Sequence, residues 1–415
     1  MKVLWITNIL FPEVVKLLTG EGELRASGGW MLGAADALLE YCDDIQLTVA
    51  APSRIVKKLT YLKGEKIEYY VLPSLPKEYV FYWKEVREKI NPDIVHIHGT
   101  EYSHGLAYVK ACGAENVVVS IQGLVSVYSR HYYDGMTMWD IIRNITIHDS
   151  VRGTIFAGKK NFFYRGESER ELIRSVNHVI GRTVWDRAHV WAINSQATYH
   201  FCNETLRHDF YTGLWSYQKC VPHTIFISQA SYPIKGLHQL LKALPLVLRH
   251  YPDTQVRIAG VNITEFSSLY ARLRRSGYAK YISGLISQLH LENNITFLGP
   301  LNAKEMKDEY LRTNVFVCPS AIENSPNSLG EAQILGVPCI ASYVGGAMDM
   351  MNAYESFLYR FEDIEMLAWK ICKLFEESMS FDNTMIRNVA KRRHDPGKNV
   401  KQLLSIYQRV LAHNV

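Results

Sequence analysis

The sequence lacks the short motifs that mark several common enzyme classes. Its 415 residues contain no D-x-D triplet, no G-x-x-x-x-G-K-[ST] loop, no G-x-S-x-G elbow and no G-x-G-x-x-G fingerprint. These absences argue against a metal held on a nucleotide by paired aspartates, a P-loop nucleotidase, an α/β-hydrolase and a simple dinucleotide-binding fold. We therefore predict no metal and no other cofactor.

Paired cysteines and long apolar runs are also missing. The seven cysteines are scattered, odd in number and without a C-x-x-C pair, so neither a disulfide framework nor a zinc site is indicated. No stretch approaches the roughly 18 apolar residues that a membrane-spanning helix needs. We expect reduced cysteines in a cytoplasmic protein.

The composition is that of an ordinary globular chain, with 47% hydrophobic and 21% charged residues and a net charge of +5. Residues 126–175 are rich in Tyr, Arg and Lys without strict periodicity. They can be interpreted as a segment that touches an anionic membrane surface, on the inner face of the plasma membrane, or as a helical insertion packed on a sheet. No motif for binding nucleic acid accompanies them, and we expect no nucleic acid partner.

Strand-like apolar segments alternate with helical segments twice along the chain. In the first series the expected strands are 2–7, 45–50, 66–71, 94–98, 117–121 and 178–181. In the second series they are 224–229, 255–259, 295–298, 315–320 and 339–342. Such alternation is typical of α/β domains with a parallel sheet covered on both faces.

The repeated pattern predicts two Rossmann-like domains. We place the N-terminal domain at 1–213, the C-terminal domain at 220–397 and a linker at 211–223. The last helix, within 398–415, is expected to return to the first domain.

The second domain contains the most informative stretch, which reads strand, loop, helix and strand from Val315 to Gly346. Ser325 suits the N-cap of the helix, Pro326 its first position and Gly336 its left-handed end. We therefore expect a helix from Pro326 to Leu335.

The start of this helix offers an anion site. The backbone N–H groups of Asn327, Ser328 and Leu329 should lack helical partners, and the positive end of the helix dipole lies behind them. Glu323 and Glu331 bracket this turn. Because ionised carboxylates only accept hydrogen bonds, they suit hydroxyl groups on either side of a diphosphate. That combination describes a nucleotide sugar.

Glu323 and Glu331 stand in E-x7-E spacing within E-N-S-P-N-S-L-G-E-A, which G-V-P-C-I-A-S and a glycine pair follow. The stretch resembles the donor-binding motif of retaining family 4 glycosyltransferases of the GT-B fold, in which two Rossmann-like domains face each other across a deep cleft. The resemblance implies a donor diphosphate on the helix N-terminus, ribose on Glu331 and donor-sugar hydroxyls on Glu323.

Other matches to the family are partial. Lys235 and the following glycine occupy the position of a phosphate-binding K-G, but Gln229 stands where the family has Arg. Gly28 and Gly29 match a glycine pair that lets the first domain approach the diphosphate. Gln122 stands where the family usually has His, so it can bind a hydroxyl but cannot act as an acid or base.

Two further residues of the first domain are candidates for the acceptor or sugar side. His98 ends an expected strand together with His96, which we interpret as structural, and no third zinc ligand is indicated. Arg182 follows another strand, where it could replace the missing donor-site Arg or pair with Asp186.

The resemblance implies a hexosyltransferase that moves a sugar, with retention, from a nucleoside diphosphate sugar, UDP-linked by expectation, to a glycan or lipid-linked acceptor, as in bacterial surface polysaccharide synthesis. Lys235 and Glu323 are the expected catalytic residues, and the leaving phosphate is the expected base. Two alternatives stay open: a nucleotide-sugar epimerase of the same fold, or a non-catalytic binding scaffold.

Overall fold

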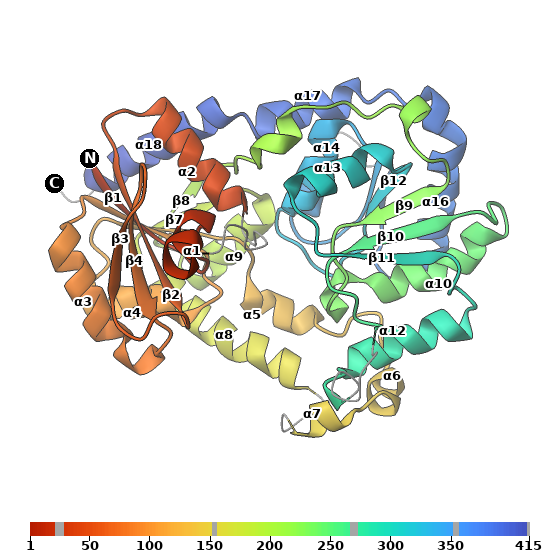
Figure 1. Cartoon of the computed structure of the whole chain (residues 1–415), viewed down its shortest axis with the longest axis horizontal. Coiled ribbons are helices and arrows are strands. Elements are labelled where there is room, and N and C mark those ends of the chain that lie inside the picture. Colours follow the sequence, from red (N-terminus) through yellow and green to blue (C-terminus); the bar gives the residue numbers. More distant parts are fainter. Residues whose placement is uncertain (21–28, 152–155, 266–272, 352–356, 413–415) are drawn as a thin grey trace. The chain divides into compact units, whose positions relative to one another are not determined.

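The computed structural model describes residues 1–20, 29–151, 156–265, 273–351 and 357–412, and its chain forms two compact units (Figure 1). The first unit comprises 1–127, 163–207 and 393–415, and the second comprises 128–162 and 208–392.

The first unit is built on an eight-stranded sheet in the order β3-β4-β2-β1-β5-β6-β7-β8. All neighbours pair in parallel except β3, which is antiparallel to β4. Its strands are β1 (Lys2–Ile6), β2 (Gln46–Ser53), β3 (Thr60–Lys63), β4 (Glu68–Pro73), β5 (Ile94–His98), β6 (Val117–Ser120), β7 (His178–Gly181) and β8 (Thr198–Phe201). The sequence pattern misses β3 and β8, whose side chains are half exposed and less apolar.

Helices connect these strands on both sides of the sheet, as parallel pairing requires. They are α1 (Pro12–Thr19), α2 (Gly29–Tyr41), α3 (Tyr79–Ile90), α4 (Ser103–Cys112), α9 (Val184–Ile193) and α18 (Pro396–Ala412). Two of the four boundaries between the units fall within α5 (Val125–Tyr128) and α8 (Ala157–Arg174).

The second unit has a six-stranded parallel sheet in the order β11-β10-β9-β12-β13-β14. The strands are β9 (Thr224–Ile227), β10 (Gln255–Ala259), β11 (Ile295–Gly299), β12 (Val315–Cys318), β13 (Cys339–Ser342) and β14 (Leu358–Tyr359). Successive strands add on one side of β9 and then, from β12 onward, on the other. The strand order therefore reverses between β9 and β12, and ligands of open α/β sheets bind at such a point, beyond the carboxyl ends of the strands.

The helices of the second unit come from two separate parts of the chain. They are α6 (Met138–Arg143), α7 (Ile147–Val151), α10 (Leu237–Leu248), α12 (Gly277–Gln288), α13 (Ala303–Arg312), α14 (Asn327–Leu335), α15 (Ala347–Met351), α16 (Ile364–Glu377) and α17 (Thr384–Arg393).

Short 3₁₀ turns occur in both units. They are Pro76–Glu78 in the first unit, and Ser129–His131, His208–Tyr211, Tyr217–Lys219, Pro233–Lys235 and Ser378–Ser380 in the second.

Residues 128–162 pack in the second unit, although the sequence prediction assigned them to the first domain. His238 of α10 contacts the main-chain oxygen of Asp134 through Nε2, at 2.9 Å, and Lys242 donates to that of Gly135 at 2.7 Å. Lys280 of α12 likewise donates to the Arg143 oxygen at 3.0 Å. These contacts depend on residues more than 100 positions away, so local periodicity could not reveal them.

The predicted linker at 211–223 also belongs to the second unit. Trp215 is 2% exposed, and its indole N–H donates to the Thr313 oxygen at 2.7 Å. Phe210, just before this stretch, is fully buried against Tyr310. The aromatic side chains bury apolar area that a solvated linker would leave exposed.

The last helix, α18, packs in the first unit. Val400, Ile406 and Val410 join the apolar cluster that contains Trp5 of β1. Tyr407 receives a hydrogen bond from the Trp5 indole at 3.0 Å. The C-terminal segment thereby completes the core of the domain in which the chain begins.

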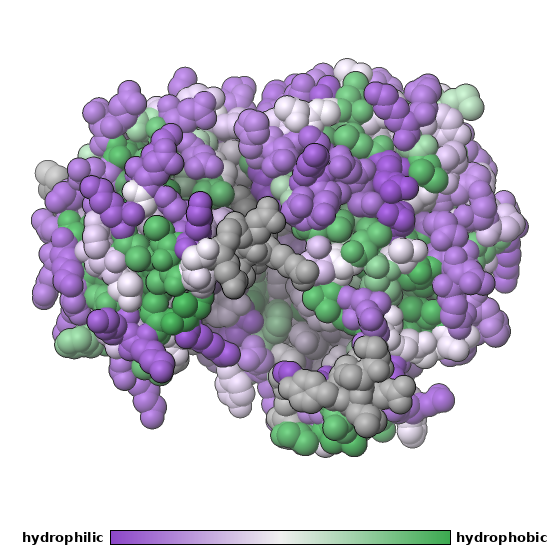
Figure 2. Space-filling model, in the orientation of Figure 1, coloured by the Kyte–Doolittle hydropathy of each residue, from purple (hydrophilic) through white to green (hydrophobic). Residues whose placement is uncertain are grey.

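Hydrophobic side chains gather on the surface over α6 and α7 (Figure 2). Trp139, Ile147 and Val151 are 65–80% exposed there. Among the described residues, no helix is long and apolar enough to cross a membrane.

Candidate functional site

Lys235 and Glu323 meet beyond the carboxyl ends of β9 and β12, the two strands between which the sheet order reverses. Lys235 ends the 3₁₀ turn that follows β9, and Glu323 lies in the loop between β12 and α14. Lys235 Nζ lies 2.6 Å from Glu323 Oε1. Ser320 Oγ donates to the same carboxylate oxygen at 2.8 Å.

This ion pair is largely buried, with 19% of the Lys235 side chain and 9% of the Glu323 side chain exposed. Burial acts to lower the pKa of Lys235, but the charge of Glu323 and the neighbouring Tyr232 and Tyr128 hold that pKa well above its usual value. The ammonium group therefore stays charged. It has three N–H donors, so two remain for an anion beside Glu323.

The structure adds a contact that the sequence did not predict. Lys235 and Glu323, which were expected to bind separate parts of a ligand, also bind each other. The lysine neutralises the carboxylate that would otherwise repel a phosphate at the start of α14. An anionic ligand can thus approach this edge of the sheet.

Two glycines let the loops around the pair approach closely. Gly236 has φ +70°, and a Cβ there would lie 1.7 Å from the Pro319 oxygen. Gly345 has φ +51°, and a Cβ there would lie 2.0 Å from the main-chain carbonyl oxygen of Glu323. The N–H of Gly346 donates to that same oxygen at 3.0 Å. Any larger residue at Gly236 or Gly345 would clash with the main chain, so both positions require glycine for the loops around Lys235 and Glu323 to pack this closely.

Helix α14 begins one residue later than predicted. Pro326, rather than Ser325, is the N-cap, and no side chain caps the helix. The N–H of Leu329 is not available as expected, because it donates to the Pro326 oxygen at 3.0 Å in a tight first turn. Asn327 and Ser328 remain as candidate donors. The helix ends at Gly336 in the left-handed conformation, as predicted.

The other donor-side candidates differ in burial. Glu331 is 4% exposed on the second turn of α14. Gln229 is exposed, and its amide makes a long contact of 3.4 Å to Ser231 Oγ. The Asn327 Oδ1 atom is buried without a hydrogen-bond partner in the described part of the chain. Gly28 lies outside the described residues, and Gly29 is the first residue of α2.

His98, Gln122 and Arg182 of the first unit all line one small cavity of about 60 Å³. His98 ends β5, and Gln122 and Arg182 lie just beyond β6 and β7, so the carboxyl ends of neighbouring strands bring them together. The sequence could predict this grouping from strand order alone.

The Arg182 guanidinium does not pair with Asp186, which was one of the two alternatives. It lies 2.6 Å from Glu204 Oε1 and donates to the Ile121 oxygen at 2.7 Å. Asp186 instead accepts from the backbone N–H of Arg182 at 3.0 Å, as part of the cap of α9. Only 4% of the Arg182 side chain is exposed.

His96 and His98 stack with their ring centroids 3.7 Å apart. His96 Nδ1 lies 2.8 Å from the Tyr407 hydroxyl, and its other nitrogen contacts Ser120, so His96 is structural as interpreted. Burial, His96 and Arg182 hold the pKa of His98 well below its usual value, and this ring is therefore neutral. Its Nε2 is buried without a partner among the described residues.

The sequence reasoning missed Glu101, which follows β5. Burial raises the pKa of this carboxyl to about 7. A Cβ on Gly99 would lie 2.3 Å from Glu101 Oε2 and 3.6 Å from Gln122 Cγ, so the carboxyl lies close to Gln122. The sequence feature that could have identified Glu101 is its position two residues after the H-x-H-G run, at the carboxyl end of an expected strand. No cluster of three or more metal-ligating side chains exists among the described residues.

Solved structures share this fold at low sequence identity. Sucrose-phosphate synthase from Thermosynechococcus elongatus aligns with a TM-score of 0.69 over 99% of both chains, at 15% identity. Anabaena HepE, solved in complex with UDP-glucose, aligns with a TM-score of 0.65 over 98% of this chain and 99% of its own, also at 15% identity. The chain therefore has the GT-B fold, as its alternating pattern predicts.

Several curated relatives are described as glycosyltransferases. An uncharacterized glycosyltransferase of Methanocaldococcus jannaschii is 25% identical over 40% of this chain and 39% of its own length. The first three relatives are matched over only 36% to 48% of their length. The putative teichuronic acid biosynthesis glycosyltransferase TuaC of Bacillus subtilis is 22% identical over the full length of both chains.

The family described as Glycosyl transferases group 1 matches residues 221–410. This range contains Lys235, Glu323, Glu331 and the reversal point of the second sheet. This chain carries a Glycosyl transferases group 1 domain, which includes its candidate site at the carboxyl ends of β9 and β12.

Proposed function

We propose that this protein is a retaining hexosyltransferase that uses a nucleoside diphosphate sugar, most readily a UDP-sugar, and needs no metal. Its acceptor is a hydroxyl of a glycan or lipid-linked saccharide, in the synthesis of a surface polysaccharide. The observation that carries the proposal is the Lys235–Glu323 pair at the reversal point of the second sheet.

The chemistry of this edge suits a diphosphate flanked by hydroxyl groups. Lys235 supplies a charged donor, and the start of α14 supplies the N–H groups of Asn327 and Ser328 together with the helix dipole. Glu331 would accept hydrogen bonds from a ribose diol. The oxygen of Glu323 that does not face Lys235 would accept hydrogen bonds from the donor sugar.

A cation and a helix N-terminus can take the place of a metal on the leaving group. In the proposed reaction, the bond from the anomeric carbon to the diphosphate oxygen breaks while the acceptor oxygen bonds to the same face. The departing diphosphate oxygen takes the acceptor proton. Lys235 stabilises the charge that develops on the diphosphate, and catalysis comes mainly from this stabilisation and from positioning.

Glu323 is a poor candidate for a covalent nucleophile. Its Oε1 already accepts from both Lys235 and Ser320. Hydrogen bonds and an adjacent cation withdraw charge from a carboxylate and fix its orientation. This supports a mechanism without a glycosyl-enzyme intermediate over the route that retaining hydrolases use.

Two similar proteins motivate the proposed class of acceptor and donor. TuaC is described as a teichuronic acid biosynthesis enzyme, which motivates a polysaccharide acceptor, and HepE was solved with UDP-glucose, which motivates a UDP-sugar. His98 and Gln122 in the first unit could bind acceptor or sugar hydroxyls. The exposed apolar surface over α6 and α7 motivates peripheral contact with a membrane that carries the acceptor.

The test is a panel of UDP-sugars and GDP-sugars incubated with the protein, with and without EDTA. Nuclear magnetic resonance then identifies the anomer of any released or transferred sugar. We expect release of a sugar in the donor's own anomeric configuration, unaffected by EDTA. Activity that EDTA abolishes and Mg²⁺ or Mn²⁺ restores would contradict metal independence.

The same panel distinguishes the two alternative functions. An epimerase would release the nucleotide with an epimerised sugar, and a binding scaffold would bind a nucleotide sugar without turning it over. Thermal shifts measured with each donor identify binding even where no reaction follows.

A further inference from the structure

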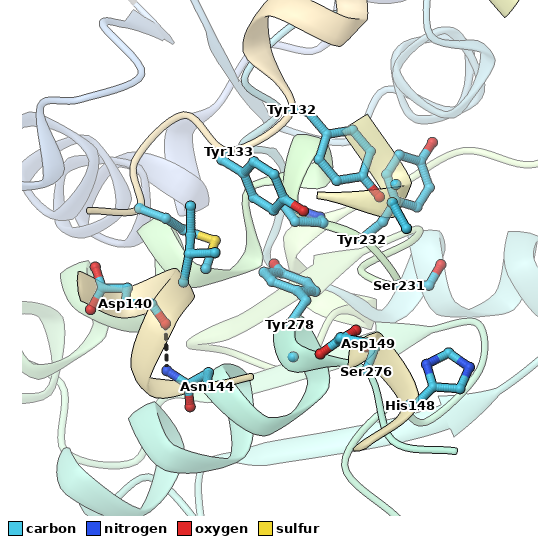
Figure 3. A pocket seen from close by; sticks show the side chains of 16 residues that line it. Tyr132, Tyr133, Asp140, Asn144, His148, Asp149, Ser231, Tyr232, Ser276 and Tyr278 are labelled. Carbon is cyan, nitrogen blue, oxygen red and sulfur yellow. Dashed lines mark hydrogen bonds between the residues drawn. The ribbon is translucent and has the colours of Figure 1, made fainter. Parts of the chain in front are cut away.

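Another cavity lies in the second unit, which also holds the Lys235–Glu323 pair, between residues 128–162 and the donor-side loops (Figure 3). Its volume is about 220 Å³, many times the roughly 10–15 Å³ that one water molecule needs. Tyr132 and Tyr133 come from the inserted segment, Tyr232 from the loop after β9, and Tyr278 from the first turn of α12.

The chemistry of the lining is selective. Tyrosine rings alternate with polar groups, among them Asp149, Asn144 and Ser231, while no lysine or arginine is present among the described lining residues. Phosphates and carboxylates call for a cation, which this cavity lacks. A purely apolar ligand would leave the polar groups without partners. The combination suits a neutral ligand with many hydroxyl groups.

Several polar groups of the cavity can form further hydrogen bonds with a ligand. Asp149 accepts from the N–H and hydroxyl of Thr146 through Oδ2 alone, at 3.1 and 2.8 Å, and a carboxylate can accept about four hydrogen bonds. The Nδ1 atom of His148 is buried and has no partner in the described part of the structure. In Figure 3 the rings of Tyr132, Tyr133 and Tyr278 converge on the middle of the view, whereas the Asp140 carboxylate points away.

The tyrosines stay protonated, so their hydroxyls keep both a donor and an acceptor. The Tyr278 hydroxyl already lies 3.3 Å from His238 Nδ1. Burial, Tyr232 and Asp149 raise the pKa of Tyr132 to about 12, and burial also raises the pKa of Tyr133 and Tyr278. A Cβ on Gly277 would lie 2.9 Å from Asp149 Oδ2, so this carboxylate lies beside the first turn of α12, which carries Tyr278.

The cavity shares one loop with the candidate donor site. Ser231 and Tyr232 line the cavity, while Gln229 and Lys235 flank them in sequence. The Tyr232 ring lies 5.8 Å from Lys235 Nζ. A ligand in the cavity would therefore lie against the loop that holds the phosphate-binding lysine.

We propose that this cavity binds one neutral monosaccharide unit, stacked on its tyrosines and hydrogen-bonded by Asp149 and by Asn144, whose amide nitrogen also donates to the Asp140 oxygen at 2.7 Å. Flat tyrosine faces suit the C–H faces of a pyranose, and the acidic and amide groups suit its hydroxyls. The sugar comes from the acceptor glycan or from the donor, and the acceptor assignment rests on the proposed function. The inserted segment 128–162 then contributes to substrate selection on the donor-binding unit.

The experiment uses the full chain and a panel of methyl glycosides of glucose, mannose, galactose and N-acetylglucosamine, observed by saturation-transfer NMR and calorimetry. Glucose 6-phosphate and glucuronic acid serve as charged probes. We expect at least one neutral glycoside to bind and both charged probes to bind at least tenfold more weakly. Absence of binding by every neutral glycoside, or equal binding of the charged probes, would overturn the proposal.

A blocking variant localises the binding. Ala157 lines the cavity as the first residue of α8, so Ala157→Trp should fill it and weaken the glycoside at least tenfold. Ala303 is the first residue of α13 and lines none of the cavities described above, so Ala303→Trp is the matched control and should change nothing. Tyr278→Phe, which keeps the ring, should weaken binding a few-fold and retains the fold if the tryptophan variant does not. Unchanged glycoside binding in both Ala157→Trp and Tyr278→Phe would place the sugar elsewhere and overturn the proposal.

Adding UDP or GDP separates the two sources of the sugar. If the cavity holds the acceptor unit, glycoside and nucleotide sugar bind together. If it holds the donor sugar, the nucleotide sugar displaces the glycoside while the free nucleotide does not. Displacement by the free nucleotide itself would assign the cavity to a nucleobase and contradict the saccharide proposal. Failure of UDP and GDP to bind anywhere, with glycoside binding intact, would instead count against the proposed function.

Discussion

Each unit has a short ion pair just beyond the carboxyl ends of its strands, and the two pairs differ in what they leave available. Lys235 and Glu323 lie 2.6 Å apart, as do Arg182 and Glu204. The lysine side chain is 19% exposed, and one of its three donors faces Glu323, whereas the arginine is 4% exposed and also donates to a main-chain oxygen. The comparison teaches that a lysine or arginine just beyond a strand end does not bind a ligand merely because of that position. What matters is whether a spare donor is accessible to a ligand. Lys235 is partly exposed, whereas the Arg182 Nε has no hydrogen-bond partner among the described residues and is buried.

The largest effect expected from this comparison is on stability. Arg182→Ala should lower the free energy of unfolding by about 3–5 kcal/mol, because it leaves the Glu204 carboxylate without its partner in a largely buried setting. Urea unfolding followed by circular dichroism measures this. Lys89→Ala, which removes an exposed ion pair with Glu85 in the same unit, is the control and should leave the transition unchanged. An Arg182→Ala protein as stable as wild type, with weakened nucleotide binding, would make Arg182 a ligand residue.

A second prediction concerns Glu101, a carboxyl that the first unit buries. Its pKa in the folded protein is about 7, against an ordinary value of 4.5. Because the folded value is higher, the folded state holds the proton more tightly. The resulting stability is complete below about pH 4.5 and is lost as pH rises through 7. The difference corresponds to about 3 kcal/mol at most.

Urea unfolding at a series of pH values tests this dependence. Glu101→Gln should flatten the fall in stability between pH 4.5 and 7, while Glu115→Gln, at an exposed position of the same unit, should not. An identical pH dependence in wild type and Glu101→Gln would show that the carboxyl ionises normally.

A smaller effect is expected from adding a cation to the second unit. Gln229 is exposed, and among the described residues its amide makes only the long contact to Ser231. Gln229→Arg should replace a neutral donor with a charged one, a gain of about 1.4 kcal/mol or tenfold in affinity for a nucleoside diphosphate. Calorimetric titration measures it, and Gln229→Met is the uncharged control. No gain would mean that the phosphates do not approach this position.

The smallest predicted change is at Glu331. Glu331→Gln should weaken nucleoside diphosphate binding about fivefold, because an amide offers one acceptor oxygen where a carboxylate offers two. The free base should bind equally well to both proteins. Equal affinity for the diphosphate in mutant and wild type would show that Glu331 does not bind the ribose.

Much of this molecule could be predicted from local pattern. The strands Ile94–His98, His178–Gly181 and Cys339–Ser342 lie as predicted because their apolar residues are contiguous and bounded by turn residues. The glycines after Lys235 and after β13 in the sequence also indicate places where two stretches of main chain come too close together for a Cβ.

The partners of charged side chains could not be predicted in this way. Arg182 contacts Glu204, 22 residues away, and Lys235 contacts Glu323, 88 residues away, and both contacts depend on the order of strands in a sheet. The assignment of 128–162 failed for a related reason. Its main-chain oxygens accept hydrogen bonds from Lys242 of α10 and Lys280 of α12. No local periodicity marks a segment whose packing surface belongs to distant helices.

The most direct test of the account is the phosphate-binding role of Lys235. Whichever of UDP and GDP binds wild type more tightly is titrated calorimetrically into wild type and Lys235→Gln, with the matching nucleoside as a control. The glutamine amide can still donate to Glu323, so the fold should be kept. The account predicts that loss of the charge weakens the diphosphate by about ten- to hundredfold, from about 1.5–3 kcal/mol, while nucleoside affinity stays the same. Equal diphosphate affinity in the two proteins would contradict it.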